Sequence, residues 1–338
     1  MTAPPHAYDD TGASLDDFCS DDAAMQACLE RARMAARTDL PILILGESGT
    51  GKTILARAIH NSSARRSRPF VAFNAAALSE TLLDSQLFGH ERGAFTGAQN
   101  RVKGKFELAD TGTLFLDEVA DLSPSAQSKI LRAVESGEFE RLGSEKLQRA
   151  DVRLISATHH RLSAAVGRNG FREDLFYRIA GITLTVPSLR ERPHDLPTLL
   201  ANEIARASRR HGTPIVGLDR AAADRLLRYA WPGNLRELSK VVHAAVALTT
   251  GDVIGGEQLL LAGESAEGSE SLAVSQTGFE TASAAADRSL REAVHRHIAK
   301  VLAEVGGNKR RAARELRVSR ATLERKLRAM AKAPSIRS

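Results

Sequence analysis

Apolar residues recur along the chain in short runs that alternate with amphipathic stretches. Five runs predict β-strands because they are apolar or β-branched and too short for helices. They are Ile42–Leu45, Phe70–Phe73, Thr113–Leu116, Val152–Ala157 and Ile182–Val186. Helical spacing of apolar residues, as in Asp21–Arg37, predicts helices between and before them. This alternation favours an α/β fold with a mainly parallel sheet and helices on both faces.

Beyond Pro187 the pattern becomes purely helical, and no further strand is expected. Three amphipathic stretches predict a small helical domain: Asp195–His211, Asp219–Tyr229 and Asn234–Thr249. Residues from about 263 to 286 are rich in Ser, Ala, Gly and Glu, which is typical of a flexible linker. Helical periodicity returns at Ser289 and continues to about Ala331.

The strongest chemical signal follows the first apolar run. The segment fits the pattern G-x-x-x-x-G-K-[ST] between a strand and a helix, which is typical of phosphate binding. Lys52 would reach the β- and γ-phosphates, and the Thr53 hydroxyl would bind Mg²⁺. The predicted nucleotide-binding residues are Gly46, Glu47, Ser48, Gly49, Thr50, Gly51, Lys52 and Thr53.

Asp117 and Glu118 end the third apolar run and predict the second half of this site. Asp117 would hold Mg²⁺, and Glu118 would polarise the attacking water. Phosphoryl transfer also needs cations near the developing charge. Arg172, Arg178 and Arg236 are candidates, but in a chain with 26% charged residues composition does not decide which of them face phosphate.

A hexapeptide with two glycines predicts a mobile hairpin loop that presents Phe95 and Thr96 outward. Its residues are Gly93, Ala94, Phe95, Thr96, Gly97 and Ala98. From the residues alone, a buried Phe95 in a structural turn is the alternative.

Residues 21 to about 260 closely resemble the AAA+ ATPase domain of bacterial sigma-54-dependent activators, and this hexapeptide is the most specific motif of that resemblance. The resemblance implies that ATP is the substrate and that the loop contacts sigma-54. It also implies that Arg172 and Arg178 are arginine fingers for a neighbouring subunit.

The same resemblance implies three further roles. Arg236 would sense nucleotide from the lid, and Thr158 would be the first sensor. Asn74 would be a switch asparagine that pairs with Glu118. His159 stands where the family has an asparagine, and its role is left open.

The net charge of +6 is divided unevenly. Residues 288–338 carry fifteen Lys or Arg against four Asp or Glu, which indicates a nucleic-acid partner at this end. Residues 291–330 resemble the Fis-type helix-turn-helix that usually ends these activators. We expect its outer face to contact double-stranded DNA through Ser319, Arg320, Ala321, Thr322, Glu324, Arg325 and Arg328. A basic helix for a protein or membrane surface is the alternative.

These observations predict five parts: an N-terminal segment (1–20), an AAA+ α/β subdomain (21–190), a helical lid (191–262), a linker (263–287) and an all-α Fis-type domain (288–332). Because about 20 residues precede the ATPase, the chain resembles the subgroup without an N-terminal receiver domain, with control in trans by a second protein. No apolar stretch is long enough for a membrane span, so a cytoplasmic protein with two reduced thiols, Cys19 and Cys28, is expected.

The sequence thus predicts an ATPase that binds DNA upstream of promoters, forms a hexameric ring and remodels the closed complex of the sigma-54 RNA polymerase holoenzyme. Two alternatives stay open. One is a DNA-translocating AAA+ motor, which the hexapeptide argues against. The other is a DNA-binding repressor that uses ATP only as an assembly ligand. The presence of Asp117, Glu118, Arg172 and Arg178 disfavours it.

Overall fold

The computed structural model describes residues 12–76, 79–160, 162 and 170–261. The chain divides into two compact units, residues 1–265 and 266–338, and the elements below belong to the first. Among the described residues no helix is long and apolar enough to cross a membrane.

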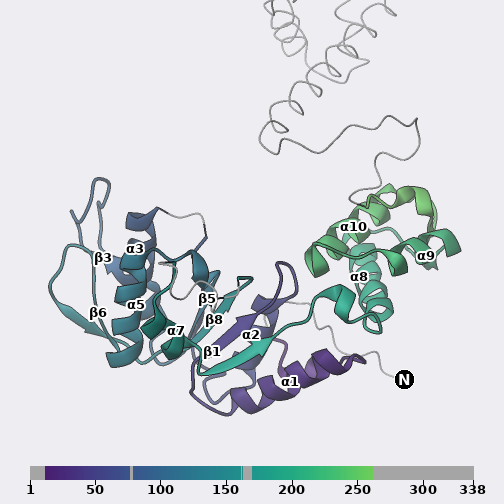
Figure 1. Ribbon diagram of the computed structural model, residues 1–338. Helices are drawn as coiled ribbons and strands as arrows, with labels where there is room; N and C mark the ends of the chain where they lie inside the picture. The colour runs from purple at the N-terminus through teal and green to yellow at the C-terminus, as the bar shows by residue number, and fades with distance from the viewer. Residues whose placement is uncertain (1–11, 77–78, 161, 163–169, 262–338) are drawn as a thin grey trace, which may run out of the picture. The chain divides into compact units, whose positions relative to one another are not determined.

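A five-stranded parallel sheet forms the centre of this unit (Figure 1). Its strands, in spatial order, are β2 (Phe70–Asn74), β5 (Thr113–Asp117), β8 (Arg153–Thr158), β1 (Ile42–Leu45) and β9 (Ile182–Thr185). Every neighbouring pair is parallel. The five strands predicted from the apolar runs are therefore confirmed, with bounds that agree to within one residue.

Helices cover both faces of the sheet, as the alternating pattern predicts. One face packs against α1 (Ala23–Ala36) and α2 (Lys52–Asn61), whose apolar side chains share a core with Phe115 and Ile155. The opposite face carries α3 (Glu80–Phe88), α4 (Lys105–Leu108), α5 (Pro124–Ser136) and α7 (Glu173–Ile179). Burial of these two apolar layers is the main stabilising contribution to the α/β part.

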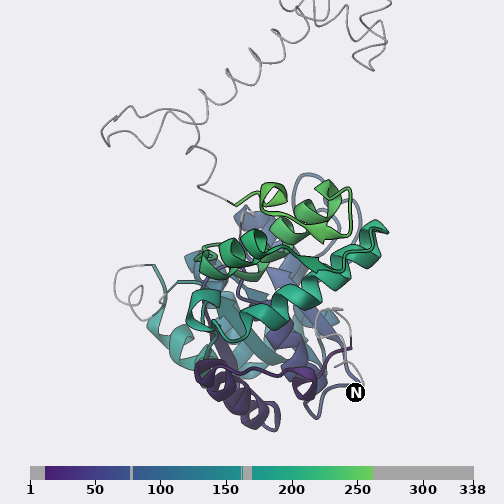
Figure 2. The same cartoon turned by 90° about the vertical axis from the view of Figure 1, so that its right-hand side faces the viewer.

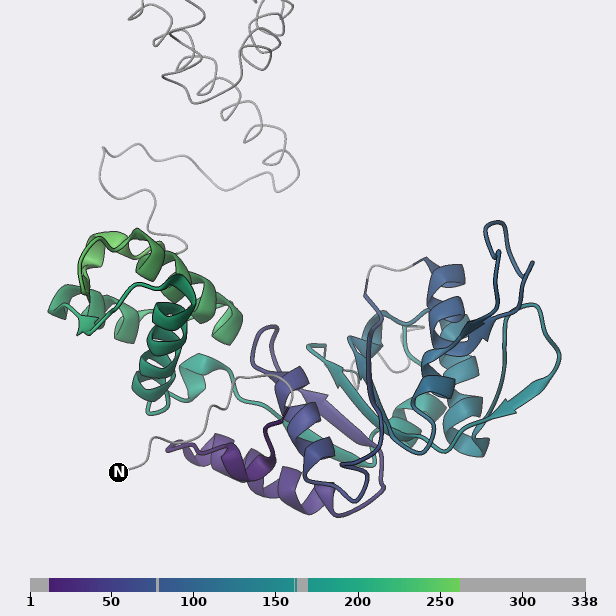
Figure 3. The ribbon, with the colours of Figure 1, turned by 180° about the vertical axis from the view of Figure 1, so that it is seen from behind.

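Two short antiparallel hairpins extend from the second face. They are β3 (Gly89–His90) with β4 (Val102–Lys103), and β6 (Glu138–Glu140) with β7 (Leu147–Arg149). Seen from behind, loops of this region project beyond α3 (Figure 3). The predicted sigma-54 loop connects β3 to β4 and therefore lies at the tip of the first hairpin.

A separate helical cluster follows the sheet, and its helices are α8 (Leu196–His211), α9 (Arg220–Arg228) and α10 (Asn234–Leu248) (Figures 1 and 2). The cluster has its own core, in which Trp231 is 1% exposed and donates its Nε1–H to the carbonyl of Leu226 at 3.1 Å. The three predicted helices are confirmed. The expectation of no further strand is wrong, because β10 (Gly217–Leu218) and β11 (Val253–Ile254) form a two-residue parallel pair.

Four one-turn 3-10 helices complete the described elements: η1 (Leu15–Asp17), η2 (Val119–Asp121), η3 (Leu189–Glu191) and η4 (Gly256–Gln258).

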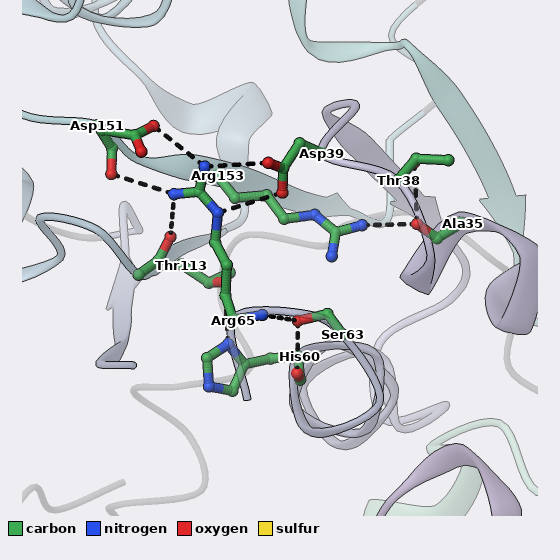
Figure 4. A network of polar contacts seen from close by, with 10 residues as sticks. Ala35, Thr38, Asp39, His60, Ser63, Arg65, Thr113, Asp151 and Arg153 are labelled. Carbon is green, nitrogen blue, oxygen red and sulfur yellow. Dashed lines mark hydrogen bonds and ion pairs between the residues drawn. The ribbon is translucent and has the colours of Figure 1, made fainter. Parts of the chain in front are cut away.

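Arg65 connects the amino-terminal ends of three neighbouring strands (Figure 4). Its guanidinium forms ion pairs with Asp39, which precedes β1, and Asp151, which precedes β8. It also donates to the carbonyl of Gly112, directly before β5. Nearby, Arg153 donates to the carbonyl of Ala35 at the end of α1, at 2.7 Å. This network fixes one end of the sheet, and the opposite, carboxyl ends of the strands remain for the candidate site.

Candidate nucleotide site

The predicted phosphate-binding loop connects β1 to α2, as its pattern requires. Gly51 precedes the helix with a φ of 100°, and Gly49 has a φ of 80°; both values favour glycine. A Cβ atom at Gly49 would also lie 2.4 Å from the carbonyl oxygen of Gly233, so only glycine fits there. The N-terminus of α2 thus faces the loop, and its free N–H groups favour an anion.

Lys52 is buried beneath this loop. Its Nζ donates to the carbonyls of Gly46 at 2.8 Å and Glu47 at 3.0 Å. Burial lowers the pKa of Lys52, whereas the charges of Glu118 and Asp117 act in the opposite direction. The ammonium therefore lies between the loop and the two predicted carboxylates, where a phosphate would be its natural partner.

One cavity of about 280 Å³ brings most of the predicted residues together. The phosphate-binding loop, the end of β5, α8 and the start of α10 all line it. Among its lining residues are Ser48, Gly49, Gly51, Lys52, Thr53, Asp117, Glu118, Glu203, Arg206 and Arg236. Glu203 and Arg206 are additions from the lid that the sequence did not single out.

Three predicted loop residues act mainly through contacts within the protein. Thr50 is buried and donates its hydroxyl to the carbonyl of Glu47 at 2.9 Å. The Glu47 carboxylate pairs with Arg190, which lowers the pKa of Glu47. Gly46, with a φ of 157°, supplies the carbonyl that accepts from Lys52.

Thr53 and Asp117 offer hard oxygen ligands to the same cavity, which fits a Mg²⁺ ion held partly by substrate phosphates. Burial and the neighbouring Glu118 raise the pKa of Asp117, and a bound cation would reverse this effect. The described residues contain no group of three or more His, Cys, Asp or Glu arranged to hold a metal by themselves. The two oxygen donors, Thr53 and Asp117, suit a hard cation such as Mg²⁺.

The lid reaches the phosphate-binding loop through the first turn of α10. Asn234 is fully buried in the left-handed region, with a φ of 52°. Its amide nitrogen donates to the Glu47 carboxylate at 3.2 Å and to the carbonyl of Ser48 at 3.0 Å. Its amide oxygen accepts from the Leu189 N–H at 2.7 Å. The sequence predicted Asn234 only as the start of a helix and not as a contact to the phosphate-binding loop. The Pro232-Gly233-Asn234 turn is the one local signal of an unusual backbone at this position.

Arg236, the predicted lid sensor, donates from Nη1 to the Ser48 hydroxyl at 2.7 Å. It lines the cavity together with the loop. The side chain is exposed, so it is available to a nucleotide phosphate.

Arg172 and Arg178 are absent from the described lining of this cavity. The Arg172 guanidinium pairs with Asp174 and donates to the Ser128 hydroxyl at 2.8 Å; the pairing lowers the pKa of Asp174 to about 2. Arg178 donates to the carbonyl of Val134 at 3.1 Å. Arg172 directly precedes α7 and Arg178 lies in its last turn, and both are exposed.

The hydrogen bonds of Asn74 and Glu118 differ from the pair implied by the resemblance. Asn74 ends β2, and its side-chain oxygen accepts from the N–H of Ala76 at 2.8 Å. Glu118 instead accepts from His159, through the backbone N–H at 3.3 Å and through Nδ1 at 2.7 Å. Among the described residues no hydrogen bond joins Asn74 to Glu118.

Thr158, the predicted first sensor, is fully buried at the end of β8. Its hydroxyl accepts from the N–H of His160 at 3.1 Å, which shapes the turn that carries His159.

The loop of residues 93–98 closes on itself through the Gly93 N–H, which donates to the carbonyl of Ala98 at 2.8 Å. Thr96 is exposed, as predicted. Phe95 is only half-exposed, because its ring packs edge-on against His90 with centroids 5.0 Å apart. The predicted outward position of Phe95 is therefore only partly observed. The predicted DNA-contact residues, 319–328, lie outside the described residues.

The chain matches three known protein families in succession. Residues 18–185 match the family described as Sigma-54 interaction domain. Residues 190–274 match the AAA+ ATPase lid domain, and residues 289–330 match the Bacterial regulatory protein, Fis family. The predicted fold class, an AAA+ α/β domain with a lid followed by a Fis-type helix-turn-helix, is confirmed by these matches and by the parallel sheet.

Individual proteins similar to this chain are transcriptional regulators or their structural neighbours, and the similarity covers most of the chain. The transcriptional regulatory protein ZraR of Escherichia coli strain K12 is 44% identical over 304 residues, which are 90% of this chain and 66% of ZraR. ZraR of Klebsiella oxytoca is also 44% identical, over 94% of this chain and 70% of that protein. NtrX from Brucella abortus, crystallised in complex with ADP, has a TM-score of 0.67 at 32% identity, over 94% of this chain and 69% of NtrX. The chain thus spans about two thirds of the length of these relatives.

Proposed function

This chain belongs to the family of bacterial sigma-54-dependent transcriptional regulators, and we propose that it is an ATPase that activates transcription by remodelling the closed complex of the sigma-54 RNA polymerase holoenzyme. It acts from upstream DNA, which its C-terminal segment binds. The activator reading is favoured over a repressor or a DNA-translocating motor because the Sigma-54 interaction domain match contains the Gly93–Ala98 loop.

The observation that carries this proposal is the shared cavity. Lys52, the adjacent pair Asp117 and Glu118, and Arg236 come from three distant segments and line one space beside the phosphate-binding loop. The relative NtrX has been crystallised in complex with ATP as well as ADP. We infer that ATP occupies the cavity here, with its phosphates in the loop.

Binding of ATP requires Lys52 to change partners. Its Nζ now donates to two carbonyls of the loop, at Gly46 and Glu47. Phosphate oxygens are stronger acceptors for an ammonium than peptide carbonyls are. The γ-phosphate would therefore compete with these carbonyls for the Lys52 ammonium, and the backbone N–H groups of the loop would bind the β-phosphate.

Hydrolysis then uses the two carboxylates for different tasks. Mg²⁺, held by Thr53 and Asp117, would neutralise charge on the phosphate oxygens. Glu118 accepts a proton from the attacking water while the water oxygen bonds to the γ-phosphorus and the bond to the bridging oxygen of ADP breaks. Arg236, in the first turn of α10, would contact the phosphates from the lid, and loss of the γ-phosphate would remove this contact.

The site requires a second subunit. Arg172 and Arg178 lie on exposed positions outside the chain's own cavity, in keeping with a role at the nucleotide of a neighbour. Such a head-to-tail contact closes into a ring, and we propose a hexamer. Thr158 and Asn74, at the ends of strands beside β5, would pass the state of the nucleotide to the loop at Phe95 and Thr96.

The proposal has three further parts: location, regulation and DNA contacts. The protein works in the cytoplasm, where its DNA and polymerase partners are, and a regulatory protein controls it in trans. The predicted DNA contacts at residues 319–328 remain part of the proposal and lie outside the described residues.

The test compares three chains in ATP hydrolysis and in sigma-54-dependent open-complex formation. Glu118→Gln should bind ATP but lose hydrolysis by about 10²-fold or more, because the general base is removed. Thr96→Ala should keep hydrolysis and lose open-complex formation. Thr250→Ala, an exposed threonine in the lid, is the matched control and should keep both.

Two outcomes would contradict the proposal. Full transcriptional function of Glu118→Gln would favour the repressor that uses ATP as an assembly ligand. Normal open-complex formation by Thr96→Ala would show that the output does not pass through this loop.

A further inference from the structure

His159 holds the carboxylate of Glu118 with two hydrogen bonds. The backbone N–H donates to Oε2 at 3.3 Å, and Nδ1 contacts the same oxygen at 2.7 Å. The two residues follow β8 and β5, which are adjacent strands of the sheet (Figure 1). The pairing of these strands therefore holds the two backbones close to one another.

The two hydrogen bonds from His159 reach only one carboxylate oxygen of Glu118, Oε2. Among the described residues, the only hydrogen bonds to the Glu118 carboxylate come from His159, and both reach Oε2. Glu118 lines the cavity, whereas His159 is not among its described lining residues. His159 thus lies behind Glu118, and Oε1 is the atom free to accept from a water molecule in the cavity.

The backbone at Glu118 reinforces this orientation. Glu118 has a φ of 52°, in the left-handed region that residues other than glycine rarely occupy. Such a conformation persists only where surrounding contacts hold it, and it occurs often at functional sites. Here the Glu118 N–H donates to the Asp117 carboxylate at 3.1 Å, and the Glu118 carbonyl accepts from the N–H of Asp121 at 3.0 Å. His159, directly after the neighbouring strand β8, holds the side chain.

His159 is itself held in place. Its ring lies against that of His160, with centroids 3.8 Å apart. The N–H of His160 donates to the hydroxyl of the buried Thr158 at 3.1 Å, which fixes the turn after β8. The imidazole is 40% exposed, and its contacts with Glu118 and His160 hold it in place.

We propose that His159 is a positioning residue for ATP hydrolysis, which holds Glu118 so that Oε1 accepts the proton of the attacking water. This inference rests on the proposed ATPase function. In the step, the water oxygen bonds to the γ-phosphorus, its proton moves to Oε1, and ADP leaves with the electrons of the broken P–O bond. His159 exchanges no proton in this step and acts on it only through Glu118.

The position of the donor atom provides a sharp test. The amide nitrogen of an asparagine lies one bond from Cγ, as Nδ1 of histidine does, whereas that of glutamine lies one bond further out. We expect His159→Ala and His159→Gln to lower kcat by about 10- to 100-fold, a typical effect of losing orientation in a catalytic group. We expect KM for ATP to change less than about twofold, because His159 does not contact the substrate. His159→Asn should restore much of kcat.

His211→Asn, at an exposed histidine that ends α8, is the matched control and should behave like the wild type. A kcat of His159→Ala equal to that of the wild type, in a chain that Glu118→Gln inactivates, would overturn this inference and leave the ATPase proposal intact. Equal losses in the Ala, Gln and Asn variants, together with weaker binding of a fluorescent ADP, would also overturn it, because they indicate a packing role. A wild-type assembly without ATP turnover would overturn the ATPase proposal and this inference with it.

Discussion

At the residue scale, the buried amide of Asn234 joins the lid to the phosphate-binding loop. It makes three hydrogen bonds, to Glu47, Ser48 and Leu189, and it lies in a left-handed conformation that asparagine tolerates better than most residues. One short side chain therefore fixes the loop, the start of α10 and the segment after β9 together. Any change there acts on the site and on stability at once.

We expect Asn234→Ala to lower the free energy of unfolding by about 2–3 kcal/mol, because buried donors and acceptors lose their partners. Urea denaturation followed by the fluorescence of Trp231, the single tryptophan, measures this at the lid. Asn100→Ala, at an exposed turn, is the control and should change stability by less than about 0.5 kcal/mol. If both variants unfold at the same urea concentration, the amide is not the link described.

Sequence motifs predicted Lys52, Thr53, Asp117 and Glu118 as one site, and the structure brings these residues to one cavity. These residues were predictable because each sits in a local pattern with a known chemical requirement. The contacts of Asn234 with Glu47 and of His159 with Glu118 were not predictable, because these partners lie 187 and 41 positions away in the sequence. Such pairs depend on how the sheet orders its strands and on where the lid packs, and no local periodicity encodes either.

At the element scale, hydrophobic patterning predicted the long elements and missed the short ones. The five central strands are apolar runs, and their burial on both faces produces that signal. The pairs β3–β4 and β10–β11 have two residues per strand, too few for an alternating pattern. Phe95 was expected outward because its loop is rich in glycine, but the nearby His90 ring provides a packing surface that the loop sequence does not reveal.

The junction between α1 and α8 adds a pH-dependent contact. The Asp22 carboxylate, before α1, accepts from His194, before α8, at 2.7 Å. This hydrogen bond raises the pKa of His194. Burial acts to raise the pKa of Asp22, but the hydrogen bonds from His194 and from the N–H of Asp195 outweigh it, and the pKa of Asp22 is lowered.

Because the pKa of His194 is raised on folding, its contribution is fully present below the ordinary imidazole value of 6.5 and is lost as the pH rises through the folded value. We expect the stability difference between the wild type and His194→Ala to be largest between about pH 5 and 6.5 and to shrink toward pH 9. Chemical denaturation across this range measures it, with His211→Ala as the control. A difference that stays constant with pH would exclude a charged His194.

At the scale of the whole molecule, the decisive question is whether one chain contains a complete site. Lys52 and Glu118 line the cavity. Arg178 lies on α7 and is not among the described residues that line it. An arginine near the transferred phosphate supplies a large share of catalysis in related phosphoryl transfers. We therefore expect a complete site to combine the nucleotide half of one chain with the arginine of the next.

Mixing two inactive variants tests this directly. Arg178→Ala keeps an intact nucleotide half, and Glu118→Gln keeps an intact arginine, so each variant alone should hydrolyse ATP at least about 10²-fold more slowly than the wild type. In a mixed ring with equal amounts of both, about one quarter of the interfaces join the two intact halves in the productive order. We therefore expect ATP turnover to recover toward about a quarter of the wild-type value on mixing. Lys52→Ala mixed with Glu118→Gln is the matched control, because both variants damage the nucleotide half and no interface is complete. Recovery in the control, or none in the test mixture while both variants still assemble, would mean that Arg178 does not act across the interface.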